Sequence, residues 1–586
     1  MPTSTNSTSS TDSTDSTDST DSTDRSSGPD TGARPTGAAD EDRSETTAPH
    51  DRRWIMLPIL CLSVFLVVVD NTIVNVALPS LSRDLGASTT ALQWIVDAYS
   101  LAFAGLLLAG GGIGDRLGRK GVMQAGLVFF GIFSAAAAAS HSTGTLIASR
   151  ACMGVAAAFI FPATLAILTT VFTDHSERQK ALGIWGATSG VAVAFGPITG
   201  GALLEHFWYG SIFLVNIPIV VVTIIGGHFL IPKLEIGPRH RFDTRGVLIS
   251  TAGVTLLVLA IIEGPQWGWG SVGTLACFTV AGALLCLFAL VELRTDKPLL
   301  DVRVFAVPRF SGGALSIAVA FFCLFGFIFL VTQYFQFVKG YSPLSSGVHT
   351  LPFAIVAAVA TPAAAVIALR VGTRLVVATG LLLMGGGLVM AGLTSKPDAA
   401  FFGPIIVAMV LLALGLSAIT APATEAVMGS LAADQLGSGA AVNNTTRELG
   451  GTLGVAVLGS VFTSAYGPRI LRAFAPYPVP AAARQAAHQS MAAALAVVQH
   501  APTSARPVLR PLAFSAFGAG LTAACMVGAG VAVAGAVYAL ASLPGRRDLA
   551  PGPAPHGDTG DTGDTGDTAD TADTADTATV APAVTM

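Results

Sequence analysis

Long apolar runs separated by short polar connections fill the chain from residue 55 to residue 541. A run of about 20 apolar residues is long enough to cross the hydrocarbon core of a membrane as an α-helix. Fourteen such runs lie at 55–78, 92–113, 121–140, 144–171, 181–204, 211–231, 246–263, 272–292, 311–333, 347–369, 374–394, 402–423, 449–466 and 513–541. The pattern therefore predicts an all-α integral membrane protein with fourteen transmembrane helices.

The composition agrees with this pattern. Of the 586 residues, 52% are hydrophobic and only 12% are charged, whereas a soluble domain carries about 25% charged residues. The sequence contains no H-E-x-x-H, no G-x-S-x-G and no nucleotide-binding G-x-x-x-x-G-K-[ST]. No cluster of His and acidic residues has the spacing of metal ligands. We therefore expect a membrane protein that is not an enzyme, holds no metal and has no nucleic-acid partner.

The formal net charge of −4 averages over two acidic tails and a basic body. Residues 1–51 and 545–586 together hold 19 acidic and 5 basic residues, and residues 52–544 hold 17 acidic and 27 basic ones. The tails repeat Ser-Thr-Asp, Asp-Thr-Gly and Asp-Thr-Ala. Tracts with so few apolar residues cannot form a packed core, so we expect both tails to be disordered. A metal-binding or regulatory role is the alternative for them.

The basic residues of the body predict its orientation. If the N-terminus is cytoplasmic, the inner connections hold sixteen Lys and Arg residues, from Arg116 to Arg447. The short outer connections then hold only Arg83, Lys339 and Lys396. Lys and Arg accumulate in cytoplasmic loops, although long loops such as 467–512 follow this rule poorly. The asymmetry predicts that both termini are cytoplasmic.

Two stretches of the chain resemble each other. Gly118–Gly126 is similar to Gly372–Gly380 at an offset of 254, and Pro162-Ala-Thr164 recurs as Pro422-Ala-Thr424 at an offset of 260. The second offset also relates Asp174 to Asp434 and Gly190 to Gly450. Matches that keep their order and nearly constant spacing indicate two similar halves, and internal repeats are typical of secondary transporters.

The repeat divides the body into three parts. We expect an N-terminal six-helix bundle at 52–233, an inserted helix pair at 246–292 and a C-terminal six-helix bundle at 311–541. The acidic tails 1–51 and 545–586 flank them.

Motifs in the first half connect the chain to a known family. The second span ends in Gly111-Gly-Ile-Gly-Asp115-Arg116-Leu-Gly118-Arg119-Lys120, and the fifth contains Gly196-Pro197-Ile-Thr-Gly200-Gly201. Together with Val69-Asp70-Asn71-Thr72 in the first span, these segments resemble motifs of the major facilitator superfamily. The match is to its fourteen-span drug:proton antiporter branch, the QacA/EmrB-like exporters, and covers roughly residues 54–541.

The resemblance implies a role for each motif. In the family the loop motif acts as a conformational latch, and its alternative here is a basic anchor that sets the orientation in the membrane. The span 5 motif is associated with exporters rather than importers. Its glycines allow close helix contact and its proline bends the helix, although a generic packing site would use the same residue types.

Three charged residues within the predicted spans are the candidates for chemistry: Asp70, Asp97 and Arg150. A charge inside a membrane helix costs about 3 kcal/mol on insertion scales, so it needs a partner, a cavity or a proton. Asp70 is the first candidate for proton coupling or for binding a cationic substrate, and its alternative is a side chain at the outer interface. The resemblance implies that Arg150 takes part in proton transfer. Either Asp70 or Asp97 could pair with Arg150.

The resemblance therefore implies a secondary active transporter that exports small hydrophobic drugs or antibiotics across the plasma membrane in exchange for protons. It implies the major facilitator fold, a monomer in the lipid bilayer, drug resistance as the outcome, and no cofactor besides the proton gradient. Two alternatives remain open on the same scaffold. One is an exporter or importer of an endogenous metabolite, and the other is a substrate-sensing receptor.

Overall fold

The computed structural model describes residues 50–232, 244–295, 302–394, 396–431 and 436–544, and both acidic tails lie outside them. These residues form helices and no strand. The helices up to residue 232 are α1 (His50–Asp84), α2 (Thr89–Leu117), α3 (Arg119–Ala138), α4 (Thr143–Val171), α5 (His175–His206), α6 (Ser211–Leu214) and α7 (Asn216–Leu230). Those that follow up to residue 428 are α8 (Thr244–Trp267), α9 (Val272–Arg294), η1 (Val302–Ala306), α10 (Pro308–Gln333), η2 (Tyr334–Val338), α11 (Pro343–His349), α12 (Leu351–Val371), α13 (Thr373–Thr394), η3 (Phe401–Ile405) and α14 (Ile406–Met428). The last are α15 (Leu436–Phe474), α16 (Ala481–Gln489), α17 (Met491–His500) and α18 (Arg506–Ser542).

Fourteen helical stretches of the described residues are long and apolar enough to cross a membrane. The all-α membrane fold predicted from the apolar runs is therefore confirmed. The thirteenth stretch differs most from the prediction, because it covers Val442–Phe474 instead of 449–466. Arg447 accordingly lies within this helix and not in a loop, which corrects its assignment to the inner connections. The division into two bundles and an inserted pair stays a prediction.

Local sequence fixes where several helices begin. The side chains of Ser88, Ser142 and Asp174 each accept a hydrogen bond from the backbone N–H three residues further on. Such capping satisfies one of the four N–H groups that a helix leaves without a partner in its first turn. These caps place the starts of α2, α4 and α5.

The internal repeat is visible in the backbone. Gly118 between α2 and α3 has φ 96°, and Gly372 between α12 and α13 has φ 101°. Side chains disfavour this left-handed region, so glycine is needed at both turns. Pro162 lies inside α4, and its counterpart Pro422 lies inside α14. The two repeated stretches therefore have the same helix breaks at matching positions.

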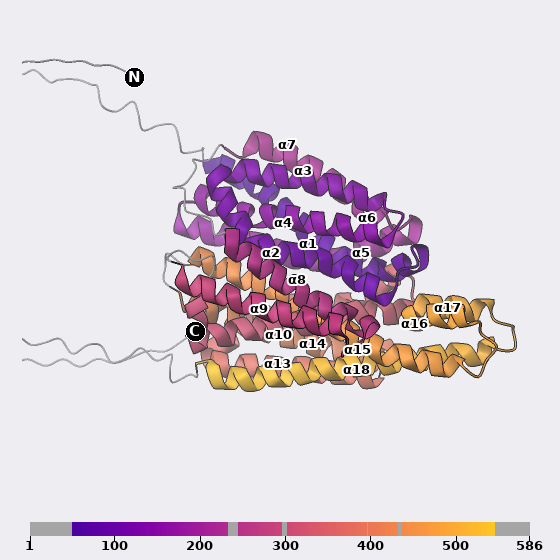
Figure 1. Cartoon of the computed structure of the whole chain (residues 1–586). Helices are drawn as coiled ribbons and strands as arrows, with labels where there is room; N and C mark the ends of the chain where they lie inside the picture. The colour runs from indigo at the N-terminus through magenta and orange to yellow at the C-terminus, as the bar shows by residue number, and fades with distance from the viewer. Residues whose placement is uncertain (1–49, 233–243, 296–301, 395, 432–435, 545–586) are drawn as a thin grey trace, which may run out of the picture. The chain divides into compact units, whose positions relative to one another are not determined.

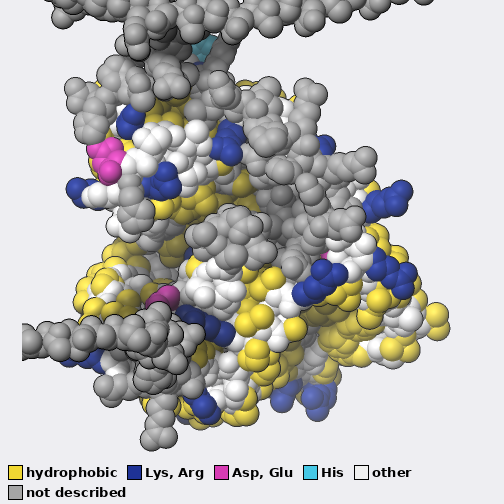
Figure 2. Space-filling view, turned by 90° about the vertical axis from the view of Figure 1, so that its left-hand side faces the viewer, with side chains coloured by type: hydrophobic (Ala, Val, Ile, Leu, Met, Phe, Trp, Pro, Cys, Tyr) yellow, Lys and Arg dark blue, Asp and Glu magenta, His cyan; other side chains and the backbone are white. Residues whose placement is uncertain are grey.

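The helices run between two ends that differ in chemistry. The connections α2–α3, α4–α5 and α12–α13 lie at one end, here called the basic end, on the left of Figure 1. Figure 2 looks onto this end and shows Lys and Arg side chains spread across it. The other end, here called the lobe end, carries α16 and α17 (Figure 1).

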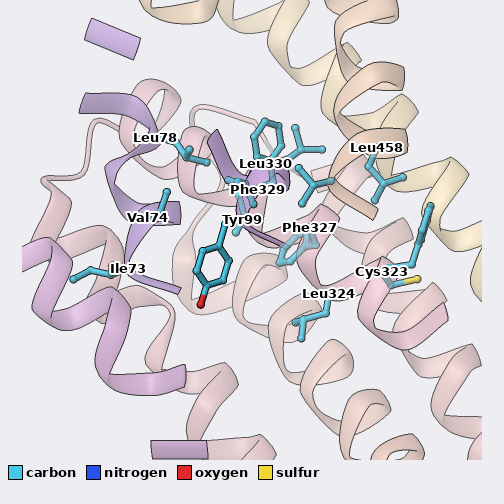
Figure 3. Packing of buried hydrophobic residues seen from close by; sticks show 14 of the residues in the cluster. Ile73, Val74, Leu78, Tyr99, Cys323, Leu324, Phe327, Phe329, Leu330 and Leu458 are labelled. Carbon is cyan, nitrogen blue, oxygen red and sulfur yellow. The ribbon is translucent and has the colours of Figure 1, made fainter. Parts of the chain in front are cut away.

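A single core cluster of buried apolar residues draws on helices from both halves. Figure 3 shows part of it, where Ile73, Val74 and Leu78 of α1 lie near Tyr99 of α2 and Phe329 and Leu330 of α10. Lipid is as apolar as these side chains, so close packing rather than water exclusion holds such helices together. The halves are in direct contact at this level.

Two glutamine side chains form hydrogen bonds between the halves. Gln93 of α2 donates to the carbonyl oxygens of Val455 and Ala456 on α15, at 3.2 and 3.0 Å. Gln336 of η2 donates to the carbonyl oxygen of Val76 on α1 at 2.8 Å. Gln93 lies in the first turns of α2, Val76 and Gln336 lie toward the lobe end of their helices, and Val455 and Ala456 lie at the middle of α15.

One face of α5 shows where this contact ends. At the lobe end, a Cβ added to Gly201 would stand 2.6 Å from the Cα of Leu344 on α11. At the basic end, Gly183, Gly186 and Gly190 have no atom of another element within 4 Å of such a Cβ. With 3.6 residues per turn, these four glycines share one face of the helix. Along α5 the halves are therefore closed at the lobe end and apart at the basic end.

The helix α8 attaches the inserted pair to both halves. On one side Trp94 of α2 donates its indole N–H to Glu263 at 3.0 Å, and on the other Ser460 of α15 donates to the carbonyl oxygen of Ile261 at 2.7 Å. The helix α9 packs against α8. The inserted pair thus lies across the seam between α2 and α15.

The segment 467–512 was predicted as an outer loop, and most of it is helical. The helix α15 continues to Phe474, α16 and α17 follow, and α18 begins at Arg506. Tyr466 donates its hydroxyl to the carbonyl oxygen of Ala487 at 2.9 Å, and Thr89, the first residue of α2, donates to that of Gln489 at 3.1 Å. These helix ends, α16 and α17 form a lobe that touches both halves.

The lobe should lose stability in acid. His488 of α16 packs against Gly467 of α15, and burial lowers the pKa of His488 from its ordinary value of 6.5. The unfolded lobe binds more protons than the folded one just below pH 6.5, so the free energy of unfolding falls as the pH drops through this range. We expect amide exchange in α16 to be faster at pH 5.5 than at pH 7.5, and this pH difference to shrink in His488→Gln. Equal pH dependence in the two proteins would contradict the assignment.

Candidate functional site

Asp70 lies near the middle of α1 with a side chain that is 0% exposed. Its Oδ2 accepts a hydrogen bond from Nη1 of Arg150 on α4 at 2.5 Å, and its Oδ1 accepts one from Nδ2 of Asn216 on α7 at 2.8 Å. Asn216 also donates to Ser134 of α3 at 3.1 Å. The carboxylate is thus paired deep inside the bundle, which excludes the alternative of a side chain at the outer interface.

Arg150 is 0% exposed as well and is held from several directions. Its Nε donates to the carbonyl oxygen of Ile95 at 3.1 Å, and its guanidinium lies 4.2 Å from the ring centre of Tyr99. Tyr99 in turn donates its hydroxyl to the carbonyl oxygen of Val67 at 3.2 Å. Figure 3 shows the Tyr99 ring among the buried side chains of the cluster. Asp70, Arg150, Asn216 and Tyr99 form what is called below the charge-pair site.

The charge-pair site can respond to a proton. Taking one of two paired buried charges away leaves the other uncompensated, at a typical cost of about 3–5 kcal/mol. A proton on Asp70 would remove the negative charge that holds the Arg150 guanidinium. Because residues of α1, α2, α3, α4 and α7 meet around this pair, such a change would act on five helices of the first half at once.

Asp97 is buried but lies outside the charge-pair site. Neither of its carboxylate oxygens has a hydrogen-bond partner among the described residues. On α2 it follows Gln93 by one helical turn and precedes Leu101 by another, and these neighbours contact α15 and α8. Of the two acids considered as partners of Arg150, the structure brings Asp70 to it and directs Asp97 to the junction of α2, α8 and α15.

Glu448 on α15 is a residue that sequence reasoning missed. The carboxylate of Glu448 lies near the side chain of Asn71, which is next to Asp70 on α1. Glu448 also interacts electrostatically with its neighbour Arg447, whose guanidinium lies 5.4 Å from the ring centre of Phe321. A carboxylate of the second half therefore reaches the helix that carries Asp70. The Arg447-Glu448 pair stands just before the predicted span 449–466. A predicted span that began seven residues earlier would have included both charges.

The loop motif binds the ends of neighbouring helices. Arg119 donates to the carbonyl oxygen of Ala166 on α4 at 3.0 Å, and also to the Thr170 hydroxyl. Lys120 donates to the carbonyl oxygens of His228 and Ile231 at the end of α7, at 2.7 and 2.5 Å. Cations at helix C-termini are favourable because the last carbonyls have no partner within the helix. The side chain of Asp115 lies outside the described residues, and the latch role stays a prediction.

The remaining residues of that motif lie at the α2–α3 turn. Gly118 forms the turn, as described above, and Gly111 faces Pro162 of α4 at 3.9 Å from an added Cβ. Arg116 lies in the last turn of α2.

The span 5 motif is built for close approach. A Cβ added to Gly196 would stand 3.0 Å from the Cβ of Thr72, and one added to Gly200 would stand 2.6 Å from a side-chain carbon of Ile73. Gly201 contacts α11, as described above, and Gly347 of α11 abuts the carbonyl of Pro197. The motif therefore packs α5 on α1 with one face and on the second half with another.

Comparison with known proteins bears on this arrangement. A family model described as Major Facilitator Superfamily matches residues 60–455. The chain is 34% identical to the multidrug efflux pump LfrA of Mycolicibacterium smegmatis, over 85% of this chain and 99% of that protein. It is 37% identical to the puromycin resistance protein pur8 of Streptomyces alboniger, over 71% of this chain and 83% of that protein.

Two further comparisons extend these. The tetracenomycin C resistance and export protein of Streptomyces glaucescens is 30% identical, over 87% of this chain and 95% of that protein. Among solved structures, a bacterial homologue of the human lysosomal transporter Spinster, in an inward-facing and unoccupied conformation, aligns with a TM-score of 0.58 at 17% identity. It covers 85% of this chain and 99% of that one, and at this identity the likeness concerns the fold.

Proposed function

The chain belongs to the major facilitator superfamily, and we propose from this premise that it exports hydrophobic drugs or antibiotics in exchange for protons, conferring resistance to them. The three relatives described above are named for efflux, resistance or export. The protein is in this proposal a transporter and not an enzyme. It works as a monomer in the lipid bilayer and needs no cofactor besides the proton gradient.

The basic end faces the cytoplasm in this proposal, and the membrane is the plasma membrane. Lys and Arg residues lie across that end (Figure 2), and such residues are retained on the cytoplasmic side during insertion. The helix α1 begins and α18 ends at this basic end, so both termini are cytoplasmic. The described conformation, closed at the lobe end, is then open toward the cytoplasm.

The observation that carries the coupling is the buried pair of Asp70 and Arg150. A carboxylate that lies within a membrane helix and is shielded from lipid is a typical proton carrier. In the mechanism, a proton reaches Asp70 from outside, neutralises it and releases Arg150. When Asp70 later releases this proton to the cytoplasm, the pair with Arg150 forms again. Glu448, which lies near Asn71, links the charge state of the first half to the second half.

Rocking of the two halves accounts for transport. The second half closes at the basic end onto the face of α5 that carries Gly183, Gly186 and Gly190. At the same time the contacts between α5 and α11 at Gly201 and Gly347 open at the lobe end. A drug bound between the halves is then exposed to the outside. The membrane potential supplies about 2.3 kcal/mol per charge at 100 mV, which corresponds to about 50-fold accumulation.

The test is transport by cells that express the full chain. We expect lower accumulation of puromycin or tetracenomycin C than in cells without it, and higher minimal inhibitory concentrations. A protonophore should raise accumulation to the level of the control cells. Export that persists after the gradient collapses would overturn proton antiport, and accumulation above the control would favour an importer. Binding without any transport would favour a receptor.

A further inference from the structure

An open cavity of about 810 Å³ lies at the lobe end between the last turns of α13 and the first turns of α18. It is far along the chain from the charge-pair site, and its walls come from two helices that lie at one edge of the bundle (Figure 1). Both helices expose large apolar residues: Leu382 and Leu393 on α13, and Val533 and Val537 on α18. Of these residues Leu393 both lines the cavity and is exposed, so we place the opening of the cavity on the lipid-facing side of the two helices.

The floor of the cavity is narrow and apolar. Gly392, Gly518, Ala519 and Thr522 line it. The Thr522 hydroxyl donates to the carbonyl oxygens of Gly392 and Gly518, at 2.6 and 2.9 Å, so it offers no free donor to a ligand. Small side chains at successive turns leave a groove between the helices that suits a hydrocarbon chain.

The mouth of the cavity is charged. Lys396 and Arg510 line it together with Asp398, and all three side chains are exposed. The Arg510 guanidinium lies 5.3 Å from the ring centre of Phe514, which keeps it over the groove. Two bases and one acid give this mouth a formal charge of +1. A groove that is apolar inside and cationic at its headgroup level is complementary to an amphiphile with one negative charge.

We propose that this cavity binds an anionic glycerophospholipid with a single phosphodiester, such as phosphatidylglycerol, from the leaflet at the lobe end. The phosphate lies between Lys396 and Arg510, and a headgroup hydroxyl donates to Asp398. One acyl chain follows the groove past Gly392 and Thr522. The bound lipid ties α13 to α18 where only small side chains connect them. The proposal needs the chain to span the membrane but does not depend on drug export.

The experiment uses the full chain purified in a mild detergent. Native mass spectrometry and thermal unfolding are recorded with added phosphatidylglycerol, phosphatidylcholine or glycerol phosphate, the last being the headgroup without chains. We expect phosphatidylglycerol alone to be retained at one copy per chain and to raise the melting temperature. Charge-assisted contacts are strong, so Lys396→Gln with Arg510→Gln should weaken apparent lipid affinity by about 100-fold, or tenfold for each base.

Two variants make the test specific. Arg469→Gln with Arg472→Gln removes two exposed bases of the lobe end that bond to their own helix and lie outside the cavity lining, and it should bind the lipid like the unchanged protein. Ala519→Leu fills the groove and should also abolish retention. The proposal would be overturned if the Lys396 and Arg510 double variant retained phosphatidylglycerol equally well, or if phosphatidylcholine bound equally well. Binding of glycerol phosphate without acyl chains, or displacement of the lipid by an exported compound, would also overturn it.

Discussion

Replacing Asp70 with asparagine is expected to abolish proton-driven export. Asparagine keeps the shape of the side chain and can still meet Asn216, but it carries no charge that a proton could neutralise. Without coupling, the accumulation of about 50-fold that 100 mV can support disappears, and the drug only equilibrates. The measurement is drug uptake into inverted vesicles with and without an imposed proton gradient.

The same substitution has a second effect that must be separated from the first. It leaves the Arg150 guanidinium buried without its charge partner, which typically costs about 3–5 kcal/mol of stability. Asp70→Asn combined with Arg150→Gln removes both charges, so its melting temperature should lie nearer to that of the unchanged protein. This folded double variant should still show no coupling.

A matched acid-to-amide change serves as the control. Glu205 near the end of α5 is exposed, and Glu205→Gln should keep both the rate and the proton dependence of export. If the Asp70 and Arg150 double variant is stable and still exports in a protonophore-sensitive way, Asp70 is not the proton carrier. Asp97 and Glu448 would then be the acids to test next.

Replacing Gly347 with valine is expected to reduce export by at least about fivefold by opening the lobe end. A Cβ at this position would overlap the carbonyl of Pro197, and a backbone carbonyl inside a helix cannot move aside as a flexible side chain would. Overpacking of this kind costs about 1–3 kcal/mol. That penalty applies only to the conformation in which α5 and α11 touch, so it lowers its population by about 5- to 150-fold.

The measurement combines transport with a distance across the lobe end. Exposed Arg83 of α1 and Arg469 of α15 lie on opposite halves, and cysteines placed there in a cysteine-free background can carry two probes. We expect a longer distance and slower export in Gly347→Val. An added Cβ on Gly282 of α9 has no atom of another described helix within 4 Å, so Gly282→Val should change neither. An unchanged distance in Gly347→Val would mean that this contact does not hold the halves together.

Much of the fold could be predicted because each membrane span corresponds to a long apolar run in the sequence. The fourteen spans and the turn at Gly118 with its counterpart at Gly372 follow from run length and from the conformations that only glycine adopts readily. The end of such a run is less certain, since charged residues inside a span resemble a loop in the sequence. For this reason Arg447 was placed in a connection and Glu448 was missed.

The pairing within the site could be narrowed but not decided from sequence. Arg150 needed an acidic partner, and Asp70 and Asp97 were both within apolar runs. The choice depends on how α2 is rotated against α1 and α4: Ile95 and Tyr99 face Arg150, and Gln93 and Asp97 lie on another face. Rotation about a helix axis is set by packing among helices that are distant in sequence, and a single sequence does not contain it.

The position of α8 makes the two long sides of the protein unequal. In the part of the chain that the structure describes, α8 contacts α2 and α15, and neither α8 nor α9 has a comparable contact with α5 or α12. In the proposed orientation, the seam between α2 and α15 is covered by α8 on the side of a hydrophobic compound in the inner leaflet, and the side of α5 and α12 has no such cover among the described residues. In that orientation a compound that enters from the bilayer would reach the space between the halves more easily from the side of α5 and α12 than from the side that α8 covers.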